Sequence, residues 1–166
     1  AWETIFCTDL FSMPSIVLKK ALIFLPVIGL YFLRAGAIPI TRDQGLNALR
    51  KMGRNAKKAV KENRSIMIFP QGTRVNPGIS SKEKPYLPGI FFLYSQAKVP
   101  VIPVAHNAGL LWPKNSFFKY PNRLRSKSVT IQILPEIKPG LSKQEFLTKL
   151  ENIIETASNK LITLEK

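Results

Sequence analysis

The stretch FPQGTR, residues 69–74, places a glycine, a hydroxyl and a guanidinium in consecutive positions directly after an apolar run. The apolar run predicts a buried strand, and ligands of open α/β sheets gather at the carboxyl ends of strands. Gly72 lets the backbone turn tightly, Thr73 can donate to an oxyanion, and Arg74 can make a two-pronged contact with the same group. These residues therefore have the chemistry of a phosphate-binding turn. An ordinary Gly-Thr turn with a solvated arginine fits the same three residues.

A second arginine, Arg42, follows another short apolar segment, AGAIPI at 35–40. Two arginines at the ends of neighbouring strands can converge on one phosphate. The alternative is that Arg42 belongs to a basic surface.

The chain has one histidine, His106, and one cysteine, Cys7, so a zinc site of the Cys/His type is excluded and no metal site is predicted. Cys7 lies among apolar residues, which predicts a buried, reduced thiol.

These residues need a framework, and the 166-residue chain is predicted to fold as a single α/β domain, residues 1–166, with a mainly parallel sheet flanked by helices. An amphipathic helix over 44–61 carries an apolar stripe, and a capping-box spacing opens a C-terminal helix at Ser142 with Glu145. The stripe on the first of these helices consists of Leu46, Leu49, Gly53, Ala56 and Val60. The face on the second consists of Phe146, Leu150, Ile153, Ala157 and Leu161. Further helices are expected over 2–12 and 88–97, and strands over 15–18, 37–40, 65–69, 99–104 and 128–134.

The most apolar segment, residues 21–33, is too short to cross a membrane. As a helix it would reach only about 20 Å against a hydrocarbon core of about 30 Å. Pro26 and Gly29 also interrupt it. We therefore expect a buried helix or one that dips into a membrane interface.

The formal charge of +15 implies an anionic partner, which could be nucleic acid, a phospholipid surface or a phosphorylated substrate. The segment 112–127, WPKNSFFKYPNRLRSK, mixes cations with aromatic residues, a composition that suits a lipid headgroup interface. A nucleic-acid-binding module is the alternative, but the chain has no recognisable nucleic-acid-binding motif. We therefore expect an anionic membrane surface as partner and no nucleic acid.

Four blocks in this order and spacing make the chain similar to the glycerophospholipid acyltransferase family, with the closest match to its 1-acyl-sn-glycerol-3-phosphate acyltransferases. They are AWET, GAIPITR, FPQGTR and VPVIPVAHNAG, and the similarity runs from residue 1 to about residue 140. The resemblance implies transfer of an acyl group from acyl-carrier protein or coenzyme A to the free hydroxyl of lysophosphatidic acid, giving phosphatidic acid in phospholipid biosynthesis. It implies no cofactor besides the acyl donor, and a membrane-associated enzyme on the cytoplasmic face of the cell membrane.

The first family motif is a histidine, four residues and an acidic residue, and Glu3 matches the acidic one. The histidine would lie five positions upstream of Glu3, before Ala1, so the resemblance implies that residues 1–166 lack an N-terminal part with the catalytic base. An inert fragment that still binds lipid phosphate is then an alternative. His106 has no acidic residue nearby in sequence to orient it, so we expect a loop histidine instead of a substitute base.

The remaining family roles carry over by position. The resemblance implies phosphate binding by Arg42, Gly72, Thr73 and Arg74. It implies a site wall formed by Gln71, Val99, Pro100 and Pro103. Gln71 stands where the family usually has glutamate, which leaves a hydrogen-bonding oxygen but removes its charge.

Overall fold

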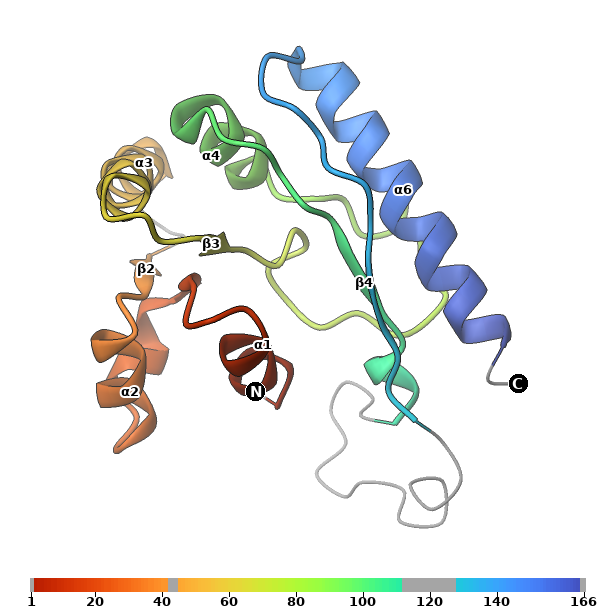
Figure 1. Ribbon diagram of the computed structural model, residues 1–166, viewed down its shortest axis with the longest axis horizontal. Helices are drawn as coiled ribbons and strands as arrows, with labels where there is room; N and C mark the ends of the chain where they lie inside the picture. Colours follow the sequence, from red (N-terminus) through yellow and green to blue (C-terminus); the bar gives the residue numbers. More distant parts are fainter. Residues whose placement is uncertain (1, 42–44, 112–127, 165–166) are drawn as a thin grey trace. The chain divides into compact units, whose positions relative to one another are not determined.

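The computed structural model describes residues 2–41, 45–111 and 128–164 (Figure 1). Their contacts divide the chain into two units. The first comprises residues 1–72 and 88–98, and the second comprises residues 73–87 and 99–166. Each unit has its own sheet and helices, and the two are described in turn.

A three-stranded parallel sheet forms the centre of the first unit. Strand β1 (Ser15–Lys19) lies between β2 (Ile38–Ile40) and β3 (Ile66–Met67). In the register, Lys19 pairs with Ile40 and Ile16 pairs with Met67. Because both neighbours run parallel to β1, the carboxyl ends of all three strands lie at one edge of the sheet.

The two faces of β1 are covered by different helices, as the two-residue period of a strand requires. Val17 packs in a cluster with residues of α3 (Gly45–Lys61) and α4 (Gly89–Ala97). Ile16 and Leu18 pack on the other side with Phe32 of α2 (Ile28–Arg34). An α/β architecture with a parallel sheet flanked by helices is therefore confirmed.

Helices α3 and α4 approach closely because α3 has a glycine where they meet. A Cβ atom at Gly53 would come within 2.8 Å of the Phe92 ring. The predicted apolar stripe of α3 was partly wrong. Leu46 is 72% exposed, whereas Met52 and Ala59, which the stripe did not include, are buried. The stripe missed these two because it followed one line along the helix, and the packed face is wider.

The second unit is built on two antiparallel strands, β4 (Val104–His106) and β5 (Ile131–Ile133). The long helix α6 (Lys143–Thr163) packs on them, and Ala105 shares a cluster with Ala157 and Leu161. All the predicted face residues of α6 are buried or half-buried. The antiparallel pair was not anticipated.

Two predicted strands are shorter than expected or displaced. Prediction placed a strand over 99–104, but the regular strand begins at Val104, and Val101 makes only an isolated bridge with Ile137. Pro100 and Pro103 have no N–H to donate to a ladder, which explains the displacement. The strand predicted over 65–69 is regular only at Ile66–Met67.

The apolar segment 21–33 is broken, as Pro26 predicted, into a 3₁₀ helix, η1 (Lys20–Phe24), and α2. Prediction of a buried helix was wrong, because most of its large apolar side chains are exposed. The side chains exposed by more than a third are Leu22, Phe24, Leu25, Val27, Ile28, Leu30 and Leu33. No helix in the described part of the chain is long and apolar enough to span a bilayer.

Helix α1 (Trp2–Leu10) begins the chain, in agreement with the predicted helix over 2–12. Cys7 is buried and forms no disulfide, as predicted.

The predicted capping box of α6 is present. The Ser142 hydroxyl accepts from the Glu145 N–H at 3.4 Å, and the Glu145 carboxylate accepts from the Ser142 N–H at 2.9 Å. We expect Ser142→Ala to lower the free energy of unfolding by about 1 kcal/mol, measured by urea denaturation. Asn152→Ala, at an exposed position in the same helix, is the control and should leave stability unchanged or slightly raised. Equal losses in both variants would contradict a specific cap.

The capping box also predicts how the effect of Ser142→Ala on stability depends on pH. The hydrogen bonds from the Ser142 side chain and backbone lower the pKa of Glu145 in the folded state. A carboxyl group with a lowered folded pKa stabilises the protein above its unfolded pKa and loses this effect as pH falls through the folded value. The stability difference between wild type and Ser142→Ala should therefore shrink on acidification below about pH 4. A difference that grows on acidification would contradict the assignment.

Candidate functional site

The chain turns sharply directly after β3. The Gly72 N–H donates to the Phe69 carbonyl at 2.9 Å, which closes a four-residue turn through Pro70 and Gln71. Gly72 has φ of +62°, a conformation that residues with a Cβ rarely adopt. The tight turn that the sequence predicted at this glycine is present, and it lies at the carboxyl end of a parallel strand.

The edge where this turn lies also receives the ends of the other two strands. Beside it, β1 ends at the exposed Lys19 and β2 continues to the half-buried Thr41. Neighbouring strands are about 4.8 Å apart, so groups from the two outer strands of this sheet are separated by roughly 10 Å. Arg42, the predicted second phosphate ligand, lies outside the described residues.

Thr73 and Arg74 begin the second unit, and both are exposed. They belong to a segment without helix or strand that continues to Leu87. An exposed hydroxyl and guanidinium directly after a left-handed glycine can both reach an anionic group in solution.

Glu3, the predicted partner of the base, lies in the first turn of α1. The surroundings of its side chain lie outside what the structure describes. The helix itself is anchored, because the Met13 N–H donates to the Thr8 carbonyl at 2.7 Å and Thr8 is fully buried. The buried Thr8 and this bond therefore hold the last turn of α1.

The predicted wall residues after α4 lie in the second unit. Val99 is half-buried, Pro100 is exposed and Pro103 is buried. Val101 and Ile137 exchange backbone hydrogen bonds of 2.9 and 2.8 Å, which fixes this segment beside the chain that follows β5.

His106 is the last residue of β4, so its prediction as a loop residue was wrong. Its Nδ1 accepts from the Ala108 N–H at 3.3 Å, at the start of the short helix η3 (Ala108–Leu110). This bond gives the imidazole a local structural role.

Sequence reasoning missed Asn107. It is 3% exposed, and its Oδ1 accepts from the Thr130 N–H at 2.8 Å. The bond joins the end of β4 to the start of the returning segment. A polar amide between a strand and an Ala-Gly pair was the available signal, since asparagine commonly caps backbone groups in turns.

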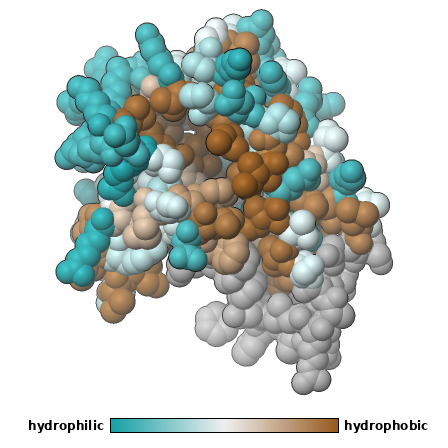
Figure 2. Space-filling view, viewed as in Figure 1, coloured by the Kyte–Doolittle hydropathy of each residue, from teal (hydrophilic) through white to brown (hydrophobic). Residues whose placement is uncertain are grey.

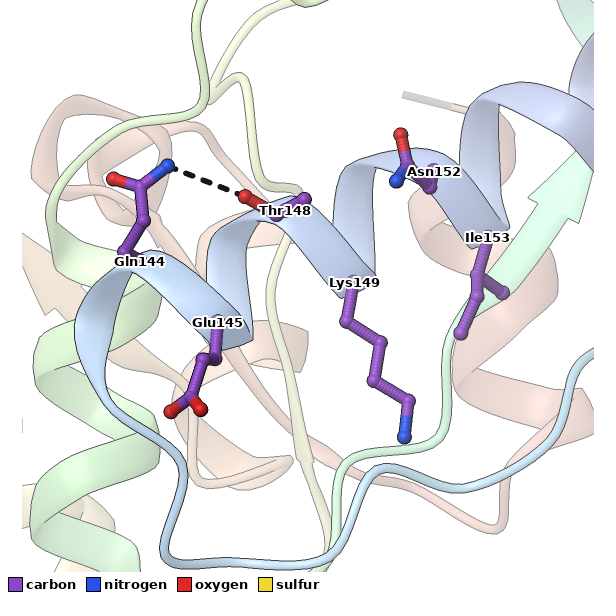
Figure 3. A pocket seen from close by; sticks show the side chains of 6 residues that line it. All are labelled: Gln144, Glu145, Thr148, Lys149, Asn152 and Ile153. Carbon is purple, nitrogen blue, oxygen red and sulfur yellow. Dashed lines mark hydrogen bonds between the residues drawn. The ribbon is translucent and has the colours of Figure 1, made fainter.

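A shallow hollow of about 580 Å³ lies along α6 (Figure 3). None of the predicted site residues lines it. Its lining residues all come from one helix: Gln144, Glu145, Thr148, Lys149, Asn152 and Ile153. Gln144 donates to the Thr148 hydroxyl at 3.2 Å across this surface (Figure 3). Because all of these residues belong to one helix, the hollow lacks the converging walls that are typical of a ligand site.

Among the described residues no group of three His, Cys, Asp or Glu side chains could hold a metal ion.

Comparison with known proteins supports the similarity of the four sequence blocks. A family model described as Acyltransferase matches residues 2–107. A 1-acyl-sn-glycerol-3-phosphate acyltransferase of Pseudomonas aeruginosa is 36% identical over 124 residues, which are 75% of this chain and 47% of that protein. The human 1-acyl-sn-glycerol-3-phosphate acyltransferase beta is 31% identical over 73% of this chain and 41% of its own length.

The fold agrees with a solved structure. The crystal structure of the 1-acyl-sn-glycerophosphate acyltransferase of Thermotoga maritima has a TM-score of 0.67 and 22% identity, and the match covers 90% of this chain and 57% of that one. The chain thus spans about half the length of the curated relatives that it matches. The family model covers more than half of the 166 residues. The chain belongs to the acyltransferase family.

Proposed function

We propose that this chain is part of an enzyme that transfers an acyl group to the free hydroxyl of 1-acyl-sn-glycerol-3-phosphate, giving phosphatidic acid. The donor is an acyl thioester of coenzyme A or acyl-carrier protein, and no further cofactor is needed. Two relatives with this printed name and the family membership support the proposal. The structural observation that carries it is the turn at Gly72, directly followed by Thr73 and Arg74.

The register of the sheet supports a phosphate site between the end of β2 and the turn at Gly72, both in the first unit. Ile40 of β2 pairs with Lys19 of β1, and β3, which pairs with the other side of β1, continues in the same direction into the turn at Gly72. Arg42 follows Ile40 by two residues in the sequence. We therefore place the acceptor phosphate between the ends of β2 and β3, where an arginine from one side and the turn from the other can bind it.

The chemistry requires a base, and we propose a histidine five positions before Glu3, preceding Ala1. Its imidazole takes the proton of the acceptor hydroxyl, and Glu3 holds the imidazole in the required tautomer. The hydroxyl oxygen then forms a bond to the thioester carbonyl carbon, the carbon–sulfur bond breaks, and the proton passes to the leaving thiolate. Gln71 and the residues Val99, Pro100 and Pro103 line the site in this proposal.

We further propose that the enzyme lies on an anionic membrane at its cytoplasmic face. The segment from η1 to α2 exposes apolar side chains, and the exposed cations Lys19, Lys20 and Arg34 flank it. Figure 2 shows hydrophobic residues at the surface over α2 and hydrophilic residues over α3. Cations beside shallowly inserted apolar side chains favour a negatively charged leaflet. The aromatic and basic segment 112–127 lies outside the described residues.

The phosphate site predicts a selective effect on the acceptor. In the full-length protein, Arg74→Ala and Arg42→Ala should each raise the KM for lysophosphatidic acid roughly 10- to 150-fold, the loss of about 1.5–3 kcal/mol for a contact with a charged group. The KM for the acyl donor should stay near its wild-type value. Arg54→Ala, at an exposed position of α3, is the control. Equal effects on both substrates would indicate a folding defect and contradict the site.

The placement of the base predicts that residues 1–166 alone transfer no measurable acyl group from labelled donor to lysophosphatidic acid. A positioned general base contributes about 10²–10⁴-fold, and a glycerol hydroxyl is a poor nucleophile without one. Extension to include the upstream histidine should restore turnover, and Glu3→Ala in the longer protein should remove most of it. Robust turnover by residues 1–166 would contradict this placement of the base.

The membrane surface predicts salt-sensitive binding to vesicles that contain anionic lipid, because exposed charges are screened over about 8–10 Å at physiological ionic strength. Replacing Phe24 and Val27, which are 75% and 83% exposed, by serine should weaken this binding. Leu46→Ser is the matched control, since Leu46 is 72% exposed on α3. Co-sedimentation with vesicles measures the effect. A loss of equal size in the control would contradict a role for the η1–α2 segment.

A further inference from the structure

The loop 73–87 begins with Thr73 and Arg74 and has no helix or strand of its own. It belongs to the second unit together with β4, η3 and α6. Contacts made further along such a loop help to fix the position of the exposed arginine at its start. The structure has two such contacts within this unit.

The first contact involves a glycine in η3. A Cβ atom at Gly109 would come within 3.0 Å of Pro77 Cγ, so any other residue there would push the loop outward by a few tenths of an ångström. Pro77 itself stands in a tight turn, in which the Ile79 N–H donates to the Asn76 carbonyl at 3.2 Å. Gly78 has φ of +87°, and proline followed by a left-handed glycine is the pattern of a type II turn. The loop therefore rests on η3 in a defined conformation three residues after Arg74.

The second contact joins the loop to the long helix. The Ser81 N–H donates to Glu155 Oε1 at 2.5 Å, and the Ser81 hydroxyl donates to Glu151 Oε2 at 3.3 Å. Glu151 and Glu155 are four residues apart, so they project from the same face of α6. Two carboxylates of one helix thus accept from both hydrogen-bond donors of one loop residue.

The same two carboxylates act on the end of the loop. Burial raises the pKa of the Tyr86 hydroxyl above its ordinary value, and Glu155 and Glu151 raise it further. The carboxylates are therefore close enough to Tyr86 for their charge to be felt there. The hydrogen bonds of Ser81 join the loop to α6, and the charge of the two carboxylates also acts on Tyr86.

Helix α6 is a firm support for such contacts. Phe146, Leu150, Ala157 and Leu161 are buried, and the capping box fixes its first turn. Glu151 and Glu155, which accept the hydrogen bonds of Ser81, are half-buried. The loop is therefore held at Ser81 against a well-packed helix of the second unit.

We propose that Glu151 and Glu155 are positioning residues for acceptor recognition: by binding Ser81 they hold the loop 73–87 in one conformation within the second unit, so that Arg74 is preorganised to bind the acceptor phosphate. This inference rests on the proposed function, because it takes Thr73 and Arg74 as phosphate ligands. It assigns to α6, beyond the matched region 2–107, a role in substrate binding. Preorganisation of this kind lowers the entropy that binding must otherwise remove.

Electrostatics alone predicts the opposite effect, which makes the inference testable. Removal of a carboxylate makes the protein more positive and should favour an anionic acceptor. Loss of the loop's anchor should weaken binding of the same acceptor. The sign of the change therefore separates positioning from bulk charge.

The experiment measures steady-state kinetics of the full-length protein with lysophosphatidic acid and acyl donor. Glu155→Ala is expected to raise the KM for lysophosphatidic acid about 10-fold, the scale for a lost bond to a charged group, with kcat and the KM for the donor unchanged. Glu155→Gln keeps an acceptor oxygen and should recover most of the loss. Glu136→Ala, which removes an exposed carboxylate of the same unit, is the matched control and should not raise the KM. A KM that is unchanged or lower in Glu155→Ala, or a glutamine variant as impaired as alanine, would overturn the proposal.

Hydrogen–deuterium exchange tests the anchoring of the loop 73–87 independently of the proposed acyl transfer. In Glu151→Ala and Glu155→Ala, amides of the loop 73–87 should exchange faster than in wild type, while those of α6 stay protected. This readout needs no turnover, so it holds even if the wild-type protein fails to acylate lysophosphatidic acid, an outcome that would reject the proposed function alone. Unchanged exchange in the loop would overturn the anchoring, and faster exchange with an unchanged KM would overturn the link to acceptor binding.

Discussion

The parallel pairing of β1 with both of its neighbours is the constraint on which the candidate site depends. Because β2 and β3 run in the same direction on either side of β1, their carboxyl ends lie at one edge. An antiparallel arrangement of either neighbour would carry its end to the opposite edge. Our proposal that the turn at Gly72 and the residues after Ile40 contribute to one site depends on this topology.

The pairing can form because β1 is buried on both faces. Its side chains alternate between the cluster of α3 and α4 and the cluster of α2, so four of its five residues are buried. Gly53 lets α3 and α4 pack tightly against each other on one side. The position of the strand ends therefore follows from the apolar packing of helices to which we assign no catalytic residue.

The sequence predicted the features that depend on local chemistry. The glycine turn after β3, the capping box at Ser142 and the break at Pro26 follow from residue types whose backbone preferences are strong. Features that depend on distant contacts were harder to predict. The exposure of the segment 21–33 and the antiparallel pairing of β4 with β5 have no local signal, because an apolar run looks the same whether protein or lipid covers it.

The same distinction applies to the site. Gly72, Thr73, Arg74 and Arg42 could be selected from their types and positions, and the family resemblance added Glu3. The contacts of Ser81 with Glu151 and Glu155 join residues about 70 positions apart, which spacing cannot reveal. A serine in a polar loop and two glutamates on a helix are ordinary until the fold brings them together.

The central claim is that the chain recognises the phosphate of its acyl acceptor at the ends of β2 and β3. The most direct measurement compares kcat/KM of the full-length enzyme for 1-acyl-sn-glycerol-3-phosphate with that for 1-acylglycerol, which has the same hydroxyl and acyl chain but no phosphate. Contacts of phosphate with charged groups predict that the phosphate-free acceptor is used at least 10-fold less efficiently, and that Arg74→Ala removes most of this difference. Equal efficiency with both acceptors in the wild-type enzyme would contradict the account.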